Sequence, residues 1–336
     1  MNKIVILKND RTGDLFTSTP LINLIFNKYK NHEIEIFLSK VNCKFSFLFK
    51  KKKIKIINLN LNLLDKIQIF LYLLVNKVDS VYILTPKNFY FYMPLLLYFK
   101  KIKFYGVCID SKKQRPYNFL RNFLYKKVVI NRINIMPRKS SYDIQRELLN
   151  YENDVINLLN TNAESNLNLD IPNNSVFFHY KHKMFKDLLE WDFLKVKKFI
   201  EFLHEKKGSV IFSSEINNKL SDSFFQESFN TYDFSENKSH IINSKKILFL
   251  KNIDGLNLYT AVKKSNEIIA PEGIITHIGY HLNKKILSLM HFKLLNRQDF
   301  INQIISCKEW FPPKNFKYTV LKKDFEKSLN KINKRI

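Results

Sequence analysis

The sequence is poor in the residues that form linkers, disulfide frameworks and membrane spans. Only 6 of its 336 residues are Gly and 9 are Pro, which argues against long flexible linkers and low-complexity tails. Its 3 cysteines lack CxxC or Cys/His ligand spacing, so they indicate reduced, buried thiols of a cytosolic protein. The longest uncharged apolar run, residues 89–99, is well short of the roughly 20 residues that span a bilayer, and the apolar residues 4–7 are too few for a signal peptide.

Acidic residues are also scarce. The chain carries 56 Lys and Arg against 30 Asp and Glu, a net charge of +26. Such a charge is typical of proteins that bind nucleic acid, an anionic membrane face or a phosphorylated ligand. Only 8 of the basic residues are Arg, whereas specific nucleic-acid binders favour Arg for bidentate contacts. The composition therefore argues against a nucleic-acid partner, and a membrane surface is the expected partner beyond the substrate.

A length of 336 residues predicts two domains, because one hydrophobic core seldom serves so long a chain. Short apolar strands alternate with helical segments, which predicts an α/β protein with parallel sheets covered on both faces. We expect a first domain over residues 1–160, a second over 173–312, and a basic C-terminal helix within 313–336 that can pack back on the first domain. The expected strands cover residues 3–8, 33–38, 54–58, 80–84, 103–107, 176–179, 209–212, 248–250 and 268–270, with another before Met290.

Two strand–loop–helix segments are the candidates for chemistry. Residues 3–8 run into a polar loop at 9–14, and residues 268–270 run into a polar turn followed by a short helix at 276–282. The first amides of such a helix point back toward the end of the strand and can bind an anion. One such segment near each end of the chain suggests two similar lobes that face one cleft.

Both segments resemble motifs of the lipopolysaccharide heptosyltransferases. That family opens with a strand, a loop that ends in Gly-Asp and a helix that carries Thr-Pro, matched here by residues 3–7, 13–14 and 19–20. Its donor loop carries an acidic residue and, five residues later, a His, matched here by Glu272 and His277. The sequence departs from the family at residues 272–274, Glu-Gly-Ile, where Asp-Ser/Thr-Gly is usual.

The resemblance implies a GT-B fold, with two Rossmann-like domains facing an interdomain cleft. It implies inverting transfer of a heptose-like sugar from a nucleotide diphosphate sugar, ADP-heptose in the best-known members, to a lipid-linked lipopolysaccharide core or related surface glycan. The first domain would bind the acceptor and the second the donor. No cofactor or metal is implied, and the protein would be cytoplasmic or peripheral on the inner membrane. The alternatives are a GT-B enzyme with another donor, or a non-catalytic basic protein that docks on a membrane or nucleic acid.

For the acceptor side, the resemblance assigns the general base to Asp14. A carboxylate at a loop tip is suited to take the proton of an acceptor hydroxyl, and the alternative is a charge that only stabilises a helix N-terminus. Gly13 would allow a tight turn that exposes Asp14, or would be an ordinary loop glycine. Further acceptor-binding candidates follow the fifth strand, where the alternative is a solvated charged rim: Lys112, Lys113 and Arg115.

For the donor side, the candidates in the second motif are Glu272, Gly273, Ile274, Ile275, Thr276 and His277. Here the amides and His277 would hold the donor diphosphate and stabilise the leaving nucleotide, unless His277 is only structural. Glu272 would bind sugar hydroxyls or cap the helix. Lys183, with Lys186 in reserve, follows the strand after which the family places a phosphate-binding lysine, and Glu215 would bind the ribose.

Basic stretches at residues 50–53 and 98–105 are expected to rest on the anionic inner leaflet of the membrane, where a lipid-linked acceptor would be presented. The alternative is a solvated charged rim around a buried strand.

Overall fold

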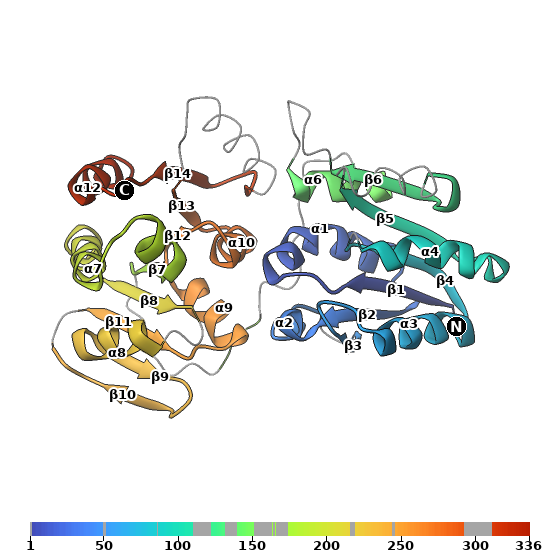
Figure 1. Ribbon diagram of the computed structural model, residues 1–336, viewed down its shortest axis with the longest axis horizontal. Helices are drawn as coiled ribbons and strands as arrows, with labels where there is room; N and C mark the ends of the chain where they lie inside the picture. Colours follow the sequence, from blue (N-terminus) through green and yellow to red (C-terminus); the bar gives the residue numbers. More distant parts are fainter. Residues whose placement is uncertain are drawn as a thin grey trace. The chain divides into compact units, whose positions relative to one another are not determined.

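The computed structural model describes residues 2–49, 52–85, 87–109, 122–131, 140–150, 163, 165, 174–215, 219–243, 246–291 and 311–336. The chain divides into two compact units (Figure 1). The first contains Met1–Thr161 and Ile304–Phe311, and the second contains Asn162–Gln303 and Pro312–Ile336.

The first unit is built on a six-stranded parallel sheet in the order β3-β2-β1-β4-β5-β6. The chain winds outward from β1 in one direction and from β4 in the other, so the winding reverses between these two strands. In doubly wound folds the crevice at the carboxyl ends of such a strand pair is the usual ligand site. The strands are β1 (Lys3–Lys8), β2 (Glu33–Ser39), β3 (Lys53–Ile57), β4 (Val78–Ile83), β5 (Lys103–Ile109) and β6 (Lys127–Asn131), and the helices are α1 (Thr12–Lys28), α2 (Lys40–Cys43), η1 (Ser46–Phe49), α3 (Leu63–Val75), α4 (Asn88–Leu96), η2 (Tyr98–Lys100), α6 (Ser141–Arg146) and η3 (Glu147–Leu149).

The second unit has an eight-stranded sheet in the order β10-β9-β11-β8-β7-β12-β13-β14, in which β10 runs antiparallel to β9 and the other pairs are parallel. Here the winding reverses between β7 and β12. The strands are β7 (Val176–Tyr180), β8 (Val210–Ser214), β9 (Asn230–Asp233), β10 (Lys238–His240), β11 (Ile247–Lys251), β12 (Glu267–Pro271), β13 (Lys285–Met290) and β14 (Phe316–Val320), and the helices are η4 (Lys183–Leu188), α7 (Phe193–Lys207), α8 (Lys219–Ser228), α9 (Gly255–Lys264), α10 (Ile274–His281) and α12 (Phe325–Asn333).

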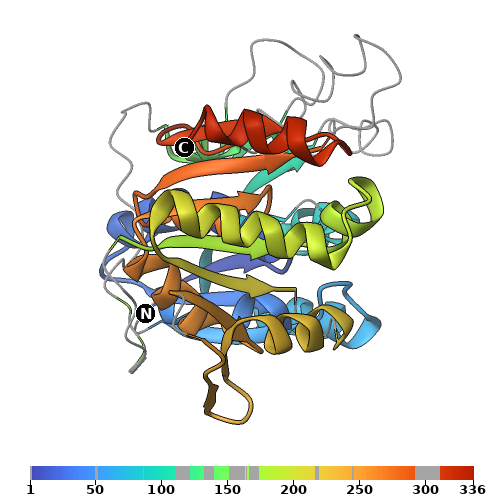
Figure 2. The same ribbon diagram turned by 90° about the vertical axis from the view of Figure 1, so that its left-hand side faces the viewer.

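Helices cover both faces of the second sheet. Figure 2 shows α7, α8 and α12 together on one face, where their apolar side chains join a buried core rich in phenylalanine. On the opposite face α10 packs closely through Gly279, since a Cβ atom there would lie 2.1 Å from Cδ1 of Ile268. This contact between helix and strand fixes where α10 begins relative to the end of β12.

The C-terminal helix α12 packs within the second unit. The indole Nε1 of Trp191 donates a hydrogen bond to the backbone oxygen of Lys323 at 3.1 Å, and the rings of Trp191 and Phe325 lie 4.9 Å apart. Ile332 is fully buried in the same core. The expectation that this helix packs on the first domain stays a prediction, whereas its contacts with the second unit are direct.

The expected α/β architecture and each of the strands predicted from the sequence are present. Elements β6, β9, β10, β14 and α8 were not predicted from the sequence. The helix that carries Thr19 and Pro20 begins at Thr12, soon after the end of β1. The helix after β12 begins at Ile274 and not at residue 276.

Asparagine takes much of the part that glycine usually plays in turns. Among the described residues, eight non-glycine residues have a positive φ, and six of them are Asn150, Asn174, Asn237, Asn252, Asn283 and Asn315. Asn tolerates the left-handed region better than other side chains do. A chain with only 6 Gly therefore builds many of its tight turns without it.

Candidate functional site

Asp14 lies at the carboxyl edge of the first sheet, beside the point where the winding reverses. It is the third residue of α1, whose N-cap is Arg11, and it is half-buried. Its backbone oxygen accepts hydrogen bonds from Thr17 Oγ1 at 2.8 Å and Ser18 Oγ at 3.1 Å. The positive end of the helix dipole favours a carboxylate at this position.

The sequence interpretation of Gly13 is wrong in its local structure. Gly13 is the second residue of α1 and is not among the positive-φ glycines, so it forms no tight turn. Small and acidic residues are favoured in the first turn of a helix, where the backbone amides lack partners. Thr12, Gly13 and Asp14 fit this position. A role for Gly13 in acceptor binding stays a prediction.

Asn9 ties the end of β1 to its surroundings. Its backbone N–H donates to Thr85 Oγ1 at 3.2 Å, its side-chain Nδ2 donates to the oxygen of Asn58 at 3.0 Å, and its Oδ1 accepts from the hydroxyl of Tyr90 at 2.9 Å. Thr85 follows β4, Asn58 follows β3, and Tyr90 lies in α4. Asn9 is fully buried, so the network makes the segment before Asp14 rigid.

A buried ion pair lies next to Asp14 and was missed from the sequence. The ammonium of Lys8, only 1% exposed, lies 2.7 Å from Oδ2 of Asp10 and donates to the oxygen of Leu84 at 3.2 Å. Burial raises the pKa of Asp10, the Lys8 ammonium opposes this rise, and the Asp14 carboxylate adds to it. The signal was available, because a lysine that closes an apolar strand needs a buried partner.

Lys87 lies close to the same pair, just before α4. Its Nζ donates a hydrogen bond to the backbone oxygen of Leu59, and burial lowers the pKa of its ammonium group while Asp10 opposes this shift. The carboxyl edge of the first sheet thus combines two carboxylates with two buried or half-buried ammonium groups. Lys112, Lys113 and Arg115, the predicted acceptor-binding residues, lie outside the described residues.

The second motif forms the start of α10 at the carboxyl edge of the second sheet. Gly273 is the N-cap residue with φ 152° and ψ −158°, a conformation that is essentially restricted to glycine. The first hydrogen bond within the helix runs from the amide of His277 to the oxygen of Gly273, at 3.4 Å. The amides of Ile274, Ile275 and Thr276 therefore have no partner within the helix, and they point toward the end of β12.

The side chains of the motif have distinct environments. Ile275 and Thr276 are buried, so these residues would meet a ligand through their backbone amides, while the Thr276 hydroxyl donates to the oxygen of Gly273 at 2.7 Å. Glu272 is exposed and lies directly before Gly273, the N-cap residue of α10.

His277 is a buried, neutral histidine. Its side chain is 4% exposed, and burial lowers its pKa to about 4. At neutral pH its imidazole offers a hydrogen bond and no positive charge. Any contribution of His277 to phosphate binding is thus that of a polar neutral group, while the charge must come from lysines.

The burial of His277 predicts a specific loss of stability in acid. In the folded protein His277 takes up a proton only near pH 4, whereas in the unfolded chain it does so near pH 6.5. Its contribution to the free energy of unfolding is therefore fully present above pH 6.5 and is lost as the pH falls to 4. We expect a loss on the order of 3 kcal/mol from this residue. Urea unfolding at several pH values between these limits gives the change of the unfolding free energy with pH. We expect this slope to be smaller in His277→Gln than in the parent protein, by the equivalent of about one proton. An unchanged slope would mean that His277 is not buried in its neutral form.

The other predicted donor-binding residues lie at the ends of β7 and β8. Lys183 and Lys186 are exposed and belong to η4, a π-helical segment of a kind often found at functional sites. The ammonium of Lys186 lies 5.9 Å from the ring centre of Phe193, while Lys183 starts the segment. Since β7 pairs with β12, Lys183 and the start of α10 follow the two strands between which the winding reverses.

Glu215 has a structural partner in this segment. Its Oε2 accepts a hydrogen bond from the amide of His182 at 2.9 Å, which joins the end of β8 to the loop after β7. One carboxylate oxygen therefore positions the segment that leads to Lys183. Binding of a ribose by Glu215 stays a prediction.

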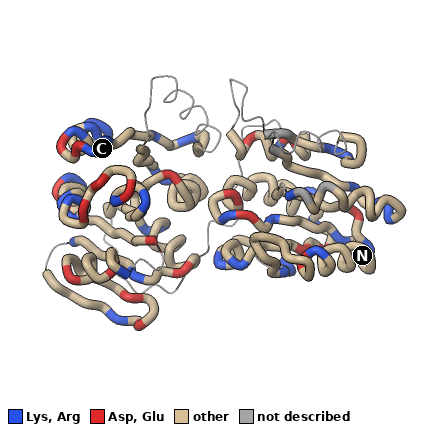
Figure 3. Tube along the Cα trace, viewed as in Figure 1, with Lys and Arg blue, Asp and Glu red and all other residues tan. Residues whose placement is uncertain are grey.

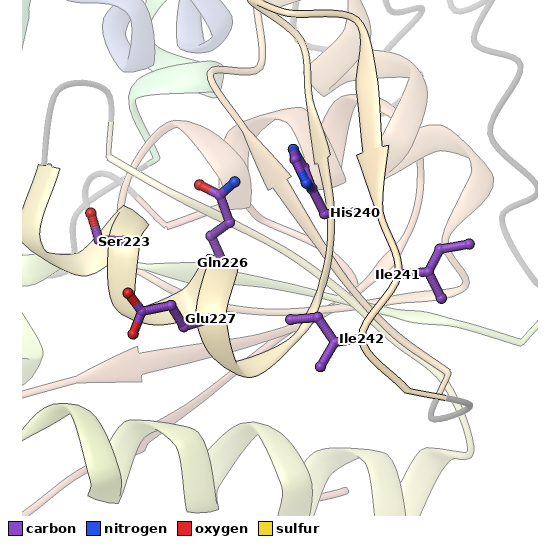
Figure 4. Close-up of a pocket in the computed structure, with 6 residues that line it drawn as sticks. All are labelled: Ser223, Gln226, Glu227, His240, Ile241 and Ile242. Atoms are coloured by element: carbon purple, nitrogen blue, oxygen red, sulfur yellow. The ribbon is translucent and has the colours of Figure 1, made fainter.

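A surface groove of about 600 Å³ lies elsewhere in the second unit (Figure 4). It is formed by α8 and the chain around β10, and its lining residues are Ser223, Gln226, Glu227, His240, Ile241 and Ile242. None of these six is Lys or Arg, and Glu227 would repel a diphosphate. The groove is not the candidate site.

The described part of the chain contains no group of three or more His, Cys, Asp or Glu residues that could hold a metal ion. No described helix is long and apolar enough to cross a membrane. Lys and Arg are spread over both units (Figure 3).

Comparison with known proteins gives different results for sequence and structure. The sequence matches no protein-family model and no curated protein. The E. coli heptosyltransferase WaaC with ADP-2-deoxy-2-fluoro heptose is similar with a TM-score of 0.66 at 10% identity, covering 99% of this chain and 98% of that chain. E. coli ADP-heptose lps heptosyltransferase II has a TM-score of 0.63 at 10% identity, with coverage of 99% and 98%. A glycosyl transferase of family 9 from Veillonella parvula has a TM-score of 0.62 at 12% identity, with coverage of 100% and 90%.

The chain has the GT-B fold. The predicted fold class is thereby confirmed, and so is the resemblance to heptosyltransferases at the level of the fold. In this GT-B chain, the strand pairs β1–β4 and β7–β12 are the reversal points of the two Rossmann-like sheets, and the two sequence motifs follow β1 and β12.

Proposed function

We propose that this GT-B protein is an inverting glycosyltransferase that moves a heptose-like sugar from ADP-heptose or a related nucleotide sugar. The acceptor would be a lipopolysaccharide core or a related surface glycan. The observation that supports it most is the placement of Asp14 and of the α10 amides, each at the reversal point of its own sheet. The solved structures that resemble this chain include heptosyltransferases, one with an ADP-heptose analogue, which supports an ADP-linked donor.

In the proposed mechanism the carboxylate of Asp14 removes the proton from an acceptor hydroxyl. The hydroxyl oxygen then bonds to the anomeric carbon of the donor sugar from the side opposite the phosphate, and the bond from that carbon to the diphosphate breaks with inversion. The nucleoside diphosphate leaves with the bonding electrons. Lys183 and the amides of residues 274–276 stabilise the charge that develops on it.

Neutral His277 would add a hydrogen bond to the diphosphate or hold the start of α10 in place. The sugar hydroxyls would bind to the exposed carboxylate of Glu272. Because this side chain is longer than the Asp usual in the family, we expect the position of the sugar, and hence the sugar preference, to differ from that of the best-known members.

Thermal unfolding with ADP, UDP, GDP and their sugars tests the proposed donor. A nucleotide at about 100 times its dissociation constant should stabilise the protein by roughly 2.7 kcal/mol. We expect ADP species to stabilise the parent protein and to lose most of this effect in Lys183→Ala. A preference for UDP or GDP would change the donor and keep the mechanism, whereas no response to any nucleotide would contradict the proposed function.

A further inference from the structure

Helices α3 and α4 both pack on the same core of the first sheet (Figure 1). Ile69 of α3 and Met93 of α4 are fully buried in the same core. The ammonium of Lys66 on α3 lies 6.0 Å from the ring centre of Phe89 on α4. Each helix therefore packs one side on the sheet and turns its other side away from it.

The sides turned away from the sheet are apolar. In α3, Leu63, Leu64 and Val75 are 70%, 74% and 79% exposed, whereas a surface helix normally places polar residues there. The exposed large apolar side chains of the two helices and the turn after α4 are Leu63, Leu64, Ile67, Leu71, Val75, Tyr92, Leu95, Leu96, Tyr98 and Phe99, which we call the apolar face. An apolar patch of this extent on a folded unit marks a binding surface.

Basic residues outnumber acidic ones around the apolar face. Within residues 52–109 the sequence has only two acidic residues, Asp65 and Asp79. Asp65 is buried, and Asp79 lies 3.3 Å from the ammonium of Lys103. Lys77 and Lys101, which follow the ends of α3 and of the turn after α4, are exposed. A second copy of this face would bring lysines against lysines, whereas an anionic surface complements them.

The aromatic residues favour a lipid surface over an acidic protein. Tyr98 and Phe99 are 78% and 66% exposed and are followed directly by Lys100 and Lys101. Tyrosine beside lysine is the combination that proteins place at the level of lipid headgroups, with apolar side chains inserted below it.

The apolar face reaches the edge of the sheet that carries Asp14. The segment before α3 is tied to that edge, since Asn58 accepts from Asn9 and Leu59 accepts from Lys87. Leu63 and Leu64 follow this segment within a few residues. A molecule anchored in lipid below the apolar face would thus present its head close to the edge where Asp14 lies.

We propose that the apolar face inserts into the headgroup region of an anionic lipid bilayer and holds the first unit on it. This inference deepens the proposed function, because it names the surface through which a lipid-linked acceptor is reached. It makes the protein peripheral, with Leu, Tyr and Phe side chains in the bilayer interface and the lysines at the phosphates.

Co-sedimentation with vesicles tests the proposal. The full chain is mixed with vesicles that contain phosphatidylglycerol and with vesicles of phosphatidylcholine alone. The test variant carries Leu64→Gln, Leu71→Gln and Leu95→Gln, and the control variant carries Leu194→Gln, Leu220→Gln and Ile241→Gln in the second unit. All six side chains are largely exposed, and neither variant changes the net charge. We expect the parent and control proteins to bind phosphatidylglycerol vesicles, and the test variant to bind them at least roughly tenfold more weakly.

Four results would overturn the proposal. These are no vesicle binding by the parent protein, equal binding by the test variant, equal loss in both variants, or self-association that depends on the apolar face without any vesicle binding. Stabilisation by nucleotide is measured on the same samples. The test variant should retain it, so failure of the membrane contact is distinguished from failure of the proposed transferase function.

Discussion

Replacing Asp14 by Asn should lower the rate of sugar transfer by about 10²–10⁴-fold, because the acceptor hydroxyl loses its general base. The amide has nearly the same size as the carboxylate, so the fold and the binding of nucleotide should persist. Release of nucleoside diphosphate from the nucleotide sugar, measured with and without deacylated lipopolysaccharide core as acceptor, reports the rate. Thermal stabilisation by the nucleotide reports binding.

A matched control exists in the same unit. Asp143 is the third residue of α6, as Asp14 is of α1, and it pairs with Arg146 at 2.5 Å. Asp143→Asn removes a carboxylate from the same helical position and also an ionic partner of the buried Arg146, so we expect it to lower folding stability more than Asp14→Asn does. We expect transfer to be lost in Asp14→Asn and kept in Asp143→Asn. Equal rates of sugar transfer in both variants would mean that Asp14 is not the general base and only stabilises the N-terminus of α1.

Replacing Gly273 by Val should weaken nucleotide binding by at least about tenfold, the equivalent of one lost hydrogen bond to a charged group. A β-branched residue cannot adopt φ 152° without strain, so the start of α10 must move. The N–H groups of its first residues would then no longer point toward the bound diphosphate. A Cβ atom on Gly273 would meet no other atom within 4 Å, so the space in front of the turn is open. The new side chain would occupy the space that the diphosphate needs.

Gly208 provides the control for the strain itself. It ends α7 with φ 78°, and a Cβ atom there also meets nothing within 4 Å. Gly208→Val and Gly273→Val should each cost on the order of 1–3 kcal/mol of folding stability. Calorimetric titration with the nucleotide that stabilises the parent protein should show weak binding only for Gly273→Val. The donor role of the turn is refuted when both variants bind as the parent does.

The fold was predictable where strands are apolar and helices are long. The strands β1, β2, β4, β7 and β12 have continuous buried runs. The missed strands differ in their patterns. In β14 the alternation of Phe316, Tyr318 and Val320 with polar residues is a strand signal that was overlooked, whereas β10 is only Lys-Ser-His and carries no apolar signal. Such strands form because neighbouring strands offer hydrogen bonds, which a local pattern does not reveal.

The candidate site was predictable as two motifs and not as a network. Asp14 and the segment from Glu272 to His277 stand out because they follow apolar strands. The hydrogen bond from Lys8 to the oxygen of Leu84 and the hydrogen bonds of Asn9 depend on residues far apart in the sequence, Thr85 and Tyr90 among them. The neutral state of His277 likewise follows from burial in the folded unit, which the spacing of a motif does not determine.

The asparagines in left-handed turns have a consequence for engineering. Each of the six holds a backbone conformation in which glycine has no steric penalty. All six side chains also make hydrogen bonds, for example from Asn252 Nδ2 to Asp233 Oδ1 at 3.0 Å and from Asn315 Nδ2 to Asn283 Oδ1 at 2.6 Å. Glycine would lose such a bond, worth up to about 1 kcal/mol, and would be freer in the unfolded chain. We therefore expect Asn→Gly changes in these turns to lower heat resistance, because each asparagine both tolerates the turn and joins it to a neighbouring side chain.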